Sequence, residues 1–419
     1  MSEKLQAPRG TFDVLPEDWP ARRAVEDAAR RILEAAGYRR IETPAFEATE
    51  LFARGVGEST DIVQKEMYTF DDAGGRSLTL RPEGTAPVAR AYLDHGMHKL
   101  AQPVKLWYLS SFFRQEKPQA GRYRQFWQVG AEAIGSADPA VDAELILLLH
   151  TILGELGVRD VRLRLSSLGS PEERLAYRGL LQDHLRAHES SLSEDVRARI
   201  DLNPLRAFDS DHPGTQRVMQ GAPRLLDHLS PEDAEHFAEV RAMLDAADVP
   251  YEIDPTLVRG MDYYTRTVFE MTSDALGAQS GVGGGGRYDG LVEMLGGPPT
   301  PGNGWAAGVE RILLAAEGLP RAAPVVDLFV ASAKPQANGP EAAFALASEA
   351  RRAGLAVQQE LAGRSLKGQL KQADRLGARY VAILGDEGIS LKDMESGEQE
   401  VLETPSAAVA RALKGRHPA

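Results

Sequence analysis

Cysteine is missing from all 419 residues of the chain. Its absence excludes disulfide bonds, thiolate metal ligands, iron–sulfur clusters and a cysteine nucleophile, so any chemistry must use other side chains. No run of eighteen apolar residues is present, and the first ten residues lack the apolar core of a secretory signal. Together these absences predict a soluble, cytoplasmic protein that does not act in a membrane.

Lysine is scarce, because arginine supplies 38 of the 48 basic residues and no lysine occurs between Lys117 and Lys334. Two explanations stay open: the base composition of the genome, or a need for planar guanidinium groups that grip phosphate or carboxylate. The formal net charge of −13 argues against non-specific coating of nucleic acid, because its long-range field repels a polyphosphate. A local basic groove remains compatible with that charge.

The pattern of apolar residues predicts two parts, a larger one over residues 1–325 and a smaller one over 326–419. A helix is expected after Pro16 and up to Gly37, followed by antiparallel hairpins, and a helical, charged insertion is expected at about 171–250. From 326 onward strands alternate with helices, which predicts a small α/β domain.

The glycine run SGVGGGGRYDGL at 280–291 does not keep the spacing of a dinucleotide fingerprint, and the chain has no GxxxxGK[ST] loop. Two interpretations stay open: glycines that let a ligand lie flat against a strand, or a bulged, tightly packed strand. His95 and His98 have no third ligand nearby in the sequence, so no metal site is expected there.

The predicted hairpin at 104–135 presents charged side chains on one face of a sheet, since the alternation of side chains along a strand places Arg114 and Glu116 on the same face. Arg114 suits a phosphate, Glu116 an amine, and Phe126 the flat face of a base. The alternative is that the arginine and the glutamate only pair with each other.

Six segments, in this order, resemble the histidyl-tRNA synthetases, a class II aminoacyl-tRNA synthetase family, over nearly the whole chain. They are PRGTFD (8–13), TLRPEGTAPVAR (79–90), FRQEKPQAGRYRQFWQ (113–128), LVRGMDYYTRTVFE (257–270), GGGRYDGL (284–291) and GWAAGVERILL (304–314). The resemblance implies an α+β fold: a class II antiparallel sheet flanked by helices with a helical insertion, and a C-terminal α/β anticodon-binding domain.

The resemblance also implies the reaction, in which L-histidine and ATP, brought with Mg²⁺, form histidyl-adenylate and pyrophosphate, and histidine then passes to the 3′ end of tRNA(His). The strand that ends at Pro44 resembles the motif through which class II enzymes form homodimers. Arginines suit this chemistry, since phosphoryl transfer depends on positioning and on stabilisation of charge.

The resemblance assigns residues to three sites, and it assigns no protein-ligated metal. Arg114 and Arg259 would hold the α-phosphate, Arg122 and Arg311 the outer phosphates, and Glu116 and Phe126 the adenine; of these, Arg114, Arg259 and Arg311 would be catalytic. The histidine residues would be Glu83, Thr85, Gln128, Glu132, Arg259, Tyr263 and Tyr264, with Glu132 and Tyr264 on the imidazole. The tRNA contacts would be Lys117, Gln119, Lys367, Lys371 and Arg375, although Lys117 stands where the family often has arginine.

Two other functions stay open from the sequence. One is the catalytically silent paralogue that regulates ATP phosphoribosyltransferase, and the other is an RNA-binding scaffold without enzyme activity. Histidine-dependent exchange between ATP and pyrophosphate separates both from a synthetase.

Overall fold

The computed structural model describes residues 5–57, 60–257, 261–320, 326–333, 339–385 and 388–415. The chain separates into two compact units, residues 1–320 and 321–419. Within the described residues, no helix is both long and apolar enough to cross a membrane.

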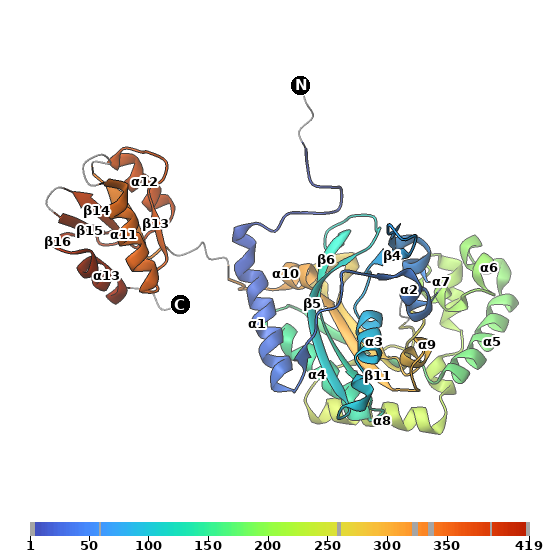
Figure 1. The fold of residues 1–419 in the computed structure, drawn as a ribbon. Coiled ribbons are helices and arrows are strands. Elements are labelled where there is room, and N and C mark those ends of the chain that lie inside the picture. Colours follow the sequence, from blue (N-terminus) through green and yellow to red (C-terminus); the bar gives the residue numbers. More distant parts are fainter. Residues whose placement is uncertain are drawn as a thin grey trace. The chain divides into compact units, whose positions relative to one another are not determined.

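The larger unit is built on an eight-stranded sheet of order β1-β5-β6-β11-β10-β9-β7-β8 (Figure 1). Neighbouring strands run antiparallel except at the two edges, where β1 and β8 lie parallel to β5 and β7. In chain order the bounds are β1 Arg39–Arg40, β5 Val104–Phe113, β6 Gln125–Ile134, β7 Val161–Ser167, β8 Glu252–Ile253, β9 Thr265–Ser273, β10 Gly281–Arg287 and β11 Gly302–Gly308. The predicted antiparallel sheet flanked by helices is confirmed.

One face of this sheet is covered by α1 (Trp19–Ala35), α4 (Pro139–Glu155), α8 (Pro231–Ala246) and α10 (Val309–Ala315). Their apolar side chains share one core with the residues that alternation points to this face, such as Val129 and Ala131 of β6. The helix expected after Pro16 is α1, and the chain turns at Gly37 with a φ of 85°.

The opposite face carries α3 (Thr85–Asp94) and α9 (Leu291–Met294), which pack on side chains such as Leu106 and Ile134. Beside them lie α2 (Thr49–Val56), the short π-helix η2 (Ile62–Glu66) and a three-stranded sheet. That sheet has the order β2-β4-β3, with bounds β2 Phe46–Ala48, β3 Tyr68–Asp71 and β4 Ser77–Leu80. Residues 65–83 thus form the expected hairpin of β3 and β4.

The helices α5 (Pro171–Ala187), α6 (Glu194–Arg199) and α7 (Pro213–Gln220) stand beside the sheet rather than on its faces (Figure 1). A capping box starts α5, since the Ser170 hydroxyl accepts from the backbone N–H of Glu173 and the Glu173 carboxylate accepts from that of Ser170. The insertion predicted at about 171–250 also includes α8, but the apolar side chains of α8 pack in the core with α4.

The smaller unit has a five-stranded sheet of order β13-β12-β14-β15-β16. The expected alternation gives the parallel strands β12 (Leu328–Ser332), β13 (Val357–Gln359) and β14 (Tyr380–Gly385), with α11 (Gly339–Arg352) and α12 (Leu366–Arg375) between them. The sequence did not indicate the elements that follow, β15 (Gly388–Asp393), β16 (Gln399–Leu402) and α13 (Pro405–Lys414).

Candidate active site

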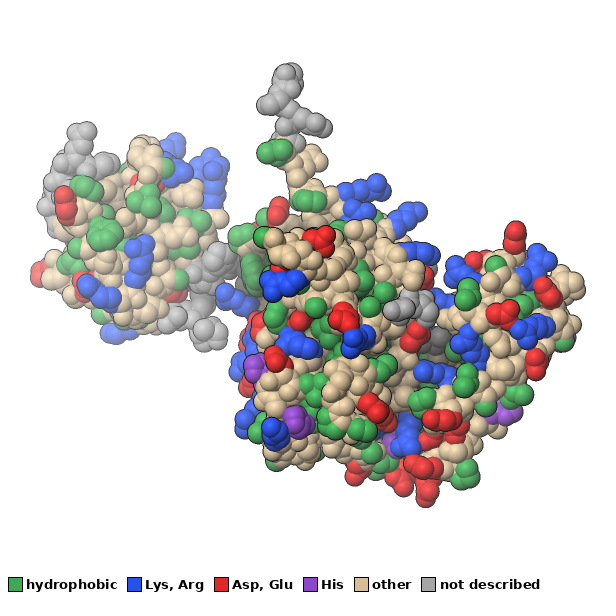
Figure 2. Space-filling model, turned by 45° about the vertical axis from the view of Figure 1, so that its right-hand side comes forward, with side chains coloured by type: hydrophobic (Ala, Val, Ile, Leu, Met, Phe, Trp, Pro, Cys, Tyr) green, Lys and Arg blue, Asp and Glu red, His purple; other side chains and the backbone are tan. Residues whose placement is uncertain are grey.

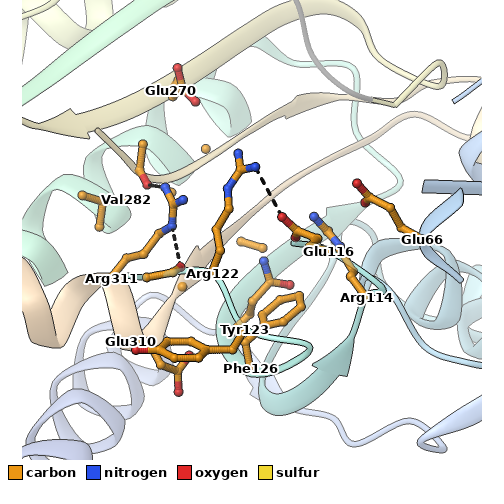
Figure 3. Close-up of a pocket in the computed structure, with 17 residues that line it drawn as sticks. Glu66, Arg114, Glu116, Arg122, Tyr123, Phe126, Glu270, Val282, Glu310 and Arg311 are labelled. Atoms are coloured by element: carbon orange, nitrogen blue, oxygen red, sulfur yellow. Dashed lines mark hydrogen bonds and ion pairs between the residues drawn. The ribbon is translucent and has the colours of Figure 1, made fainter. Parts of the chain in front are cut away.

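A cavity of about 290 Å³ lies on the sheet of the larger unit, between the β5–β6 hairpin and the start of α10 (Figure 3). It brings together five of the six residues that the resemblance assigned to ATP, all except Arg259, and one assigned only to histidine. These are Arg114, Glu116, Arg122, Phe126, Arg311 and Gln128.

Phe126 and Gln128 lie within β6, whereas the charged cavity residues of the hairpin lie beyond the ends of its regular strands. β5 ends at Phe113, but Arg114 still pairs with the opposite side, because its N–H donates to the carbonyl of Arg124 at 3.0 Å. At the tip, Gln119 and Arg122 exchange backbone hydrogen bonds of 3.1 and 2.9 Å, and Gly121 takes a φ of 72°. This tight turn directs Arg122 back over the cavity.

Three guanidinium groups from the hairpin and α10 face the cavity (Figure 3). Arg114 donates to the carbonyl of Pro82 at 2.9 Å and lies 5.4 Å from the centre of the Phe126 ring. Arg311 donates to the carbonyls of Gly121, at 3.1 Å, and Gly281. Burial, followed by repulsion from Arg122, lowers the pKa of Arg311. A polyphosphate in the cavity would relieve this crowding of positive charge.

Acidic groups share the cavity with these cations. Glu116 pairs with Arg122 at 3.4 Å, so the pairing that the sequence left open involves Arg122. Glu66 and Glu270 also line the cavity, and burial raises the pKa of Glu66. Neither residue was predicted, because η2 and the register of β9 bring them in from distant parts of the chain.

A second group of predicted residues is buried around Glu132 of β6, whose side chain is fully enclosed. One carboxylate oxygen accepts from the hydroxyls of Thr85, at 2.8 Å, and Tyr108, at 3.4 Å, while the other accepts from Tyr288 at 2.7 Å. Burial raises the pKa of Glu132 to about 8. The side chain therefore holds a proton at neutral pH unless a ligand supplies a cation or a further donor.

Glu83 lies at the start of α3 and accepts from the backbone N–H groups of Thr85, at 2.7 Å, and Ala86, at 3.0 Å. Burial nevertheless raises the pKa of Glu83, and the charge of Arg114 acts in the opposite direction. Two buried carboxyl groups joined through Thr85 thus provide acceptors for a cationic or amine-bearing ligand.

Close packing around Glu132 requires a glycine on the neighbouring strand. A Cβ atom at Gly304 of β11 would lie 1.7 Å from a carboxylate oxygen of Glu132. Tyr108 and Tyr288 are partners of Glu132 that were not predicted from the sequence. Tyr288 stands in the GGGRYDGL segment, and Tyr108 lies on the same face of β5 as Leu106, so both signals were available.

Tyr263 and Tyr264 precede β9 and are both almost fully buried. Their ring centres are 4.7 Å apart, and the Tyr263 ring lies 5.8 Å from that of Tyr288. The structure thus brings the predicted tyrosine pair to the group around Glu132. Arg259, assigned to the α-phosphate, lies outside the described residues.

The glycines of the run at 280–291 have two different surroundings. Gly281, Gly283 and Gly284 of β10 line the cavity. Gly285 is instead packed against β11, since a Cβ atom there would lie 1.9 Å from the carbonyl oxygen of Gly304. The register of β10 on β9 is irregular at both ends of the run.

The amino-terminal segment supports one wall of the cavity. The carbonyl of Gly10 accepts from the backbone N–H of Arg124 at 2.7 Å. The Phe12 ring lies 4.6 Å from the ring of Tyr123, which lines the cavity. The PRGTFD segment therefore supports the hairpin residues beside the cavity, a role that its sequence did not indicate.

The residues assigned to tRNA are exposed. Lys117 and Gln119 lie at the hairpin tip, and Lys367, Lys371 and Arg375 share the outer face of α12, whose inner face buries Gln369 and Ala373. The flanking basic residues are ion-paired, Arg364 with Glu360 and Arg379 with Asp393.

On the larger unit, Figure 2 shows basic and acidic side chains interspersed. Among the described residues, no group of three or more His, Asp or Glu is placed to hold a metal ion.

Comparison with known proteins gives two family matches. The family described as histidyl-tRNA synthetase matches residues 10–312, and the anticodon binding domain matches residues 327–412. A protein named histidine–tRNA ligase from Halorhodospira halophila is 50% identical over 99% of this chain and 100% of its own length. One of the same name from Streptomyces avermitilis is 51% identical over 94% and 95%. The solved apo histidyl-tRNA synthetase of S. aureus is 37% identical, with a TM-score of 0.80 over 97% of this chain and 99% of that one.

Proposed function

Because the chain belongs to the histidyl-tRNA synthetase family, we propose how its own residues carry out the family's reaction. The chain is an aminoacyl-tRNA ligase that joins histidine to tRNA. The assignment of roles depends on one observation. Three arginines, the aromatic ring of Phe126 and the carboxylate of Glu116 meet in one cavity, beside the two buried carboxyl groups of Glu83 and Glu132.

ATP occupies the cavity in this proposal. Phe126 stacks on the adenine, Glu116 accepts a hydrogen bond from its amino group, and Arg122 and Arg311 contact the outer phosphates. Support comes from the lining of the cavity, to which all four contribute. Mg²⁺ enters with the nucleotide as part of the substrate, since this hard cation prefers phosphate and water oxygens.

Histidine lies over the buried carboxyl group. Its imidazole N–H donates to Glu132 and its second ring nitrogen contacts Tyr264, while Tyr263 lines the pocket. The α-amino group contacts Glu83, Thr85 and Gln128. Gln128 supports this placement, since its side-chain oxygen is buried without a hydrogen-bond partner among the described residues. A pocket of buried polar groups rejects apolar amino acids, because those would leave these groups unpaired.

In the first step the histidine carboxylate attacks the α-phosphorus, the bond to the β-phosphate oxygen breaks, and pyrophosphate leaves. Arg114 and Arg259 hold the α-phosphate and stabilise the charge that builds on its oxygens. In the second step a ribose hydroxyl of the tRNA end attacks the acyl carbon and AMP leaves. Fixed cations serve both steps, since both move negative charge.

We propose that catalysis and anticodon binding belong to different parts of the chain. Residues 1–325 form the catalytic domain and 326–419 the domain that binds the anticodon of tRNA(His), with Lys367, Lys371 and Arg375 contacting phosphates and Lys117 and Gln119 meeting the acceptor end. The protein acts in the cytoplasm as a homodimer. The small sheet β2-β4-β3 supports dimerisation, since it exposes Phe46 and Phe70, whose ring centres lie 6.2 Å apart.

The decisive experiment is ATP–pyrophosphate exchange with each amino acid in turn. We expect exchange with histidine alone, and a loss of at least about 100-fold in Arg114→Ala, as for removal of a group that stabilises transition-state charge. Arg23→Ala, on the exposed side of α1, is the matched control. Absence of histidine-dependent exchange would contradict the proposed roles of these residues, and unchanged exchange in Arg114→Ala would overturn the role of that residue.

A further inference from the structure

Arg174 links the helical insertion directly to the loop of the two tyrosines. It lies in the first turns of α5, and its guanidinium group donates to the carbonyl of Tyr264 at 2.7 Å and to that of Asp262 at 3.1 Å. Burial lowers the pKa of Arg174, while the Asp262 carboxylate acts in the opposite direction. A planar, permanently charged fork fixes the two carbonyls relative to each other, which a single donor does not achieve.

The loop at 261–264 depends on such outside contacts, because β9 begins only at Thr265. On its other side, the backbone N–H of Asp262 donates to the carbonyl of Val56, the last residue of α2, at 3.1 Å. The loop is thus held between α2 and α5, and its backbone determines where the phenol groups of Tyr263 and Tyr264 point.

The first residues of α5 are held beside this loop by further hydrogen bonds and ion pairs. Glu173 caps Ser170 and also accepts from the backbone N–H of Ser230, where the chain returns from the insertion. Arg266, two residues beyond Tyr264, pairs with Asp233 of α8 at 2.7 Å, and its backbone N–H donates to the carbonyl of Gly169 at 2.8 Å. A shift of α5 would therefore reach the tyrosine loop directly, through the two hydrogen bonds of Arg174.

We propose that Arg174 is a positioning residue for histidine: through it, the helical insertion sets the tyrosine side of the histidine pocket. The inference rests on the proposed assignment of Tyr263 and Tyr264 to that pocket. It places the control of amino-acid affinity in a segment that lies outside the sheet and does not line the nucleotide cavity.

The test measures the KM for histidine and for ATP in pyrophosphate exchange with Arg174→Ala and Arg174→Lys. The KM for histidine should rise about 10- to 100-fold in Arg174→Ala, the range expected for hydrogen bonds from a charged donor. Arg174→Lys should show a smaller rise, because an ammonium keeps the charge but not the fork. The KM for ATP should change less than about twofold, since the nucleotide is held by other residues.

Arg178→Ala is the matched control. Arg178 lies one turn further along α5 and also donates to two backbone carbonyls, those of Asp201 and Leu202, but both belong to the insertion itself. Its loss weakens the insertion without releasing the tyrosine loop, so both KM values should stay near those of the parent. Equal rises in the two alanine variants would show a general structural effect and overturn the proposal.

Tyr264→Phe separates failure of this inference from failure of the pocket assignment. If Tyr264→Phe leaves the KM for histidine unchanged, the pocket itself is wrongly assigned. If it raises that KM and neither Arg174 variant does, Arg174 is not a positioning residue. Hydrogen exchange of the amides at 261–265 gives a readout without turnover: it should be faster in Arg174→Lys than in the parent and unchanged in Arg178→Ala, and equal rates in all three would also reject the proposal.

Discussion

Replacing Glu132 by glutamine should raise the free energy of unfolding at alkaline pH and lower the affinity for histidine. The folded pKa of Glu132 is raised from its usual 4.5 to about 8, because the side chain is fully buried. Below pH 4.5 the carboxyl is protonated in both the folded and the unfolded chain and has no effect. As the pH rises from 4.5 to 8, the unfolded chain releases this proton more readily, so stability falls.

The size of this loss follows from the two pKa values. At 1.36 kcal/mol per pKa unit, the free energy of unfolding falls by at most about 5 kcal/mol between pH 4.5 and 8 on account of Glu132. Glutamine has nearly the same shape and no proton to lose, and the hydroxyl of Tyr288 can rotate to accept from its amide. The variant therefore lacks this pH-dependent loss.

Urea unfolding of both proteins from pH 5 to 9 measures the effect. The difference in unfolding free energy between Glu132→Gln and the parent should grow with pH and level off above about pH 8. The KM for histidine should rise about 10- to 100-fold in the variant, since a hydrogen bond to a charged acceptor is lost. A pH-independent stability difference would refute the argument from burial, and an unchanged KM would refute the role in histidine binding.

Three other variants test the remaining assignments. Phe126→Leu should raise the KM for ATP several-fold in pyrophosphate exchange and leave the KM for histidine near its parental value, because only the aromatic face is lost; a selective effect on histidine would contradict the assignment. Arg259→Ala should retain histidine binding in calorimetry and nearly abolish exchange, and normal exchange would remove Arg259 from the mechanism. Replacing Lys367, Lys371 and Arg375 together by glutamine should raise the KM for tRNA and flatten its dependence on salt without affecting exchange; an unchanged salt dependence would show that the outer face of α12 does not contact RNA.

Local patterns of the chain predicted much of the fold. Residues 19–35 repeat apolar side chains at helical spacing, and 104–135 alternate as two paired strands, so α1 and the β5–β6 hairpin could be foreseen. The same alternation placed Arg114 and Phe126 toward one site. These signals act between residues close in sequence, or repeat along one element, and a reader of the sequence can see them.

Contacts between distant segments were not visible in this way. Tyr288 meets Glu132 across 156 residues of sequence, because Tyr288 directly follows β10, and only β11, with Gly304 opposite Glu132, lies between β10 and β6 in the sheet. Glu66 lines the cavity because it lies at the end of the short π-helix η2, and no repeat of apolar residues predicts that helix. The helix α8 has the charged composition of the insertion, and only its packing on α4 shows that it belongs to the core.

The contact between Gly10 and Arg124 matters for anyone who handles this protein. Because Phe12 contacts Tyr123 of the cavity wall, a protease cut or a fused tag just before residue 10 would lie close to the cavity that we propose for ATP. The activity of a protein with a shortened or extended amino terminus therefore depends on that change as well as on the substitution under test. Preparations with matched ends are needed before the rates of two variants are compared.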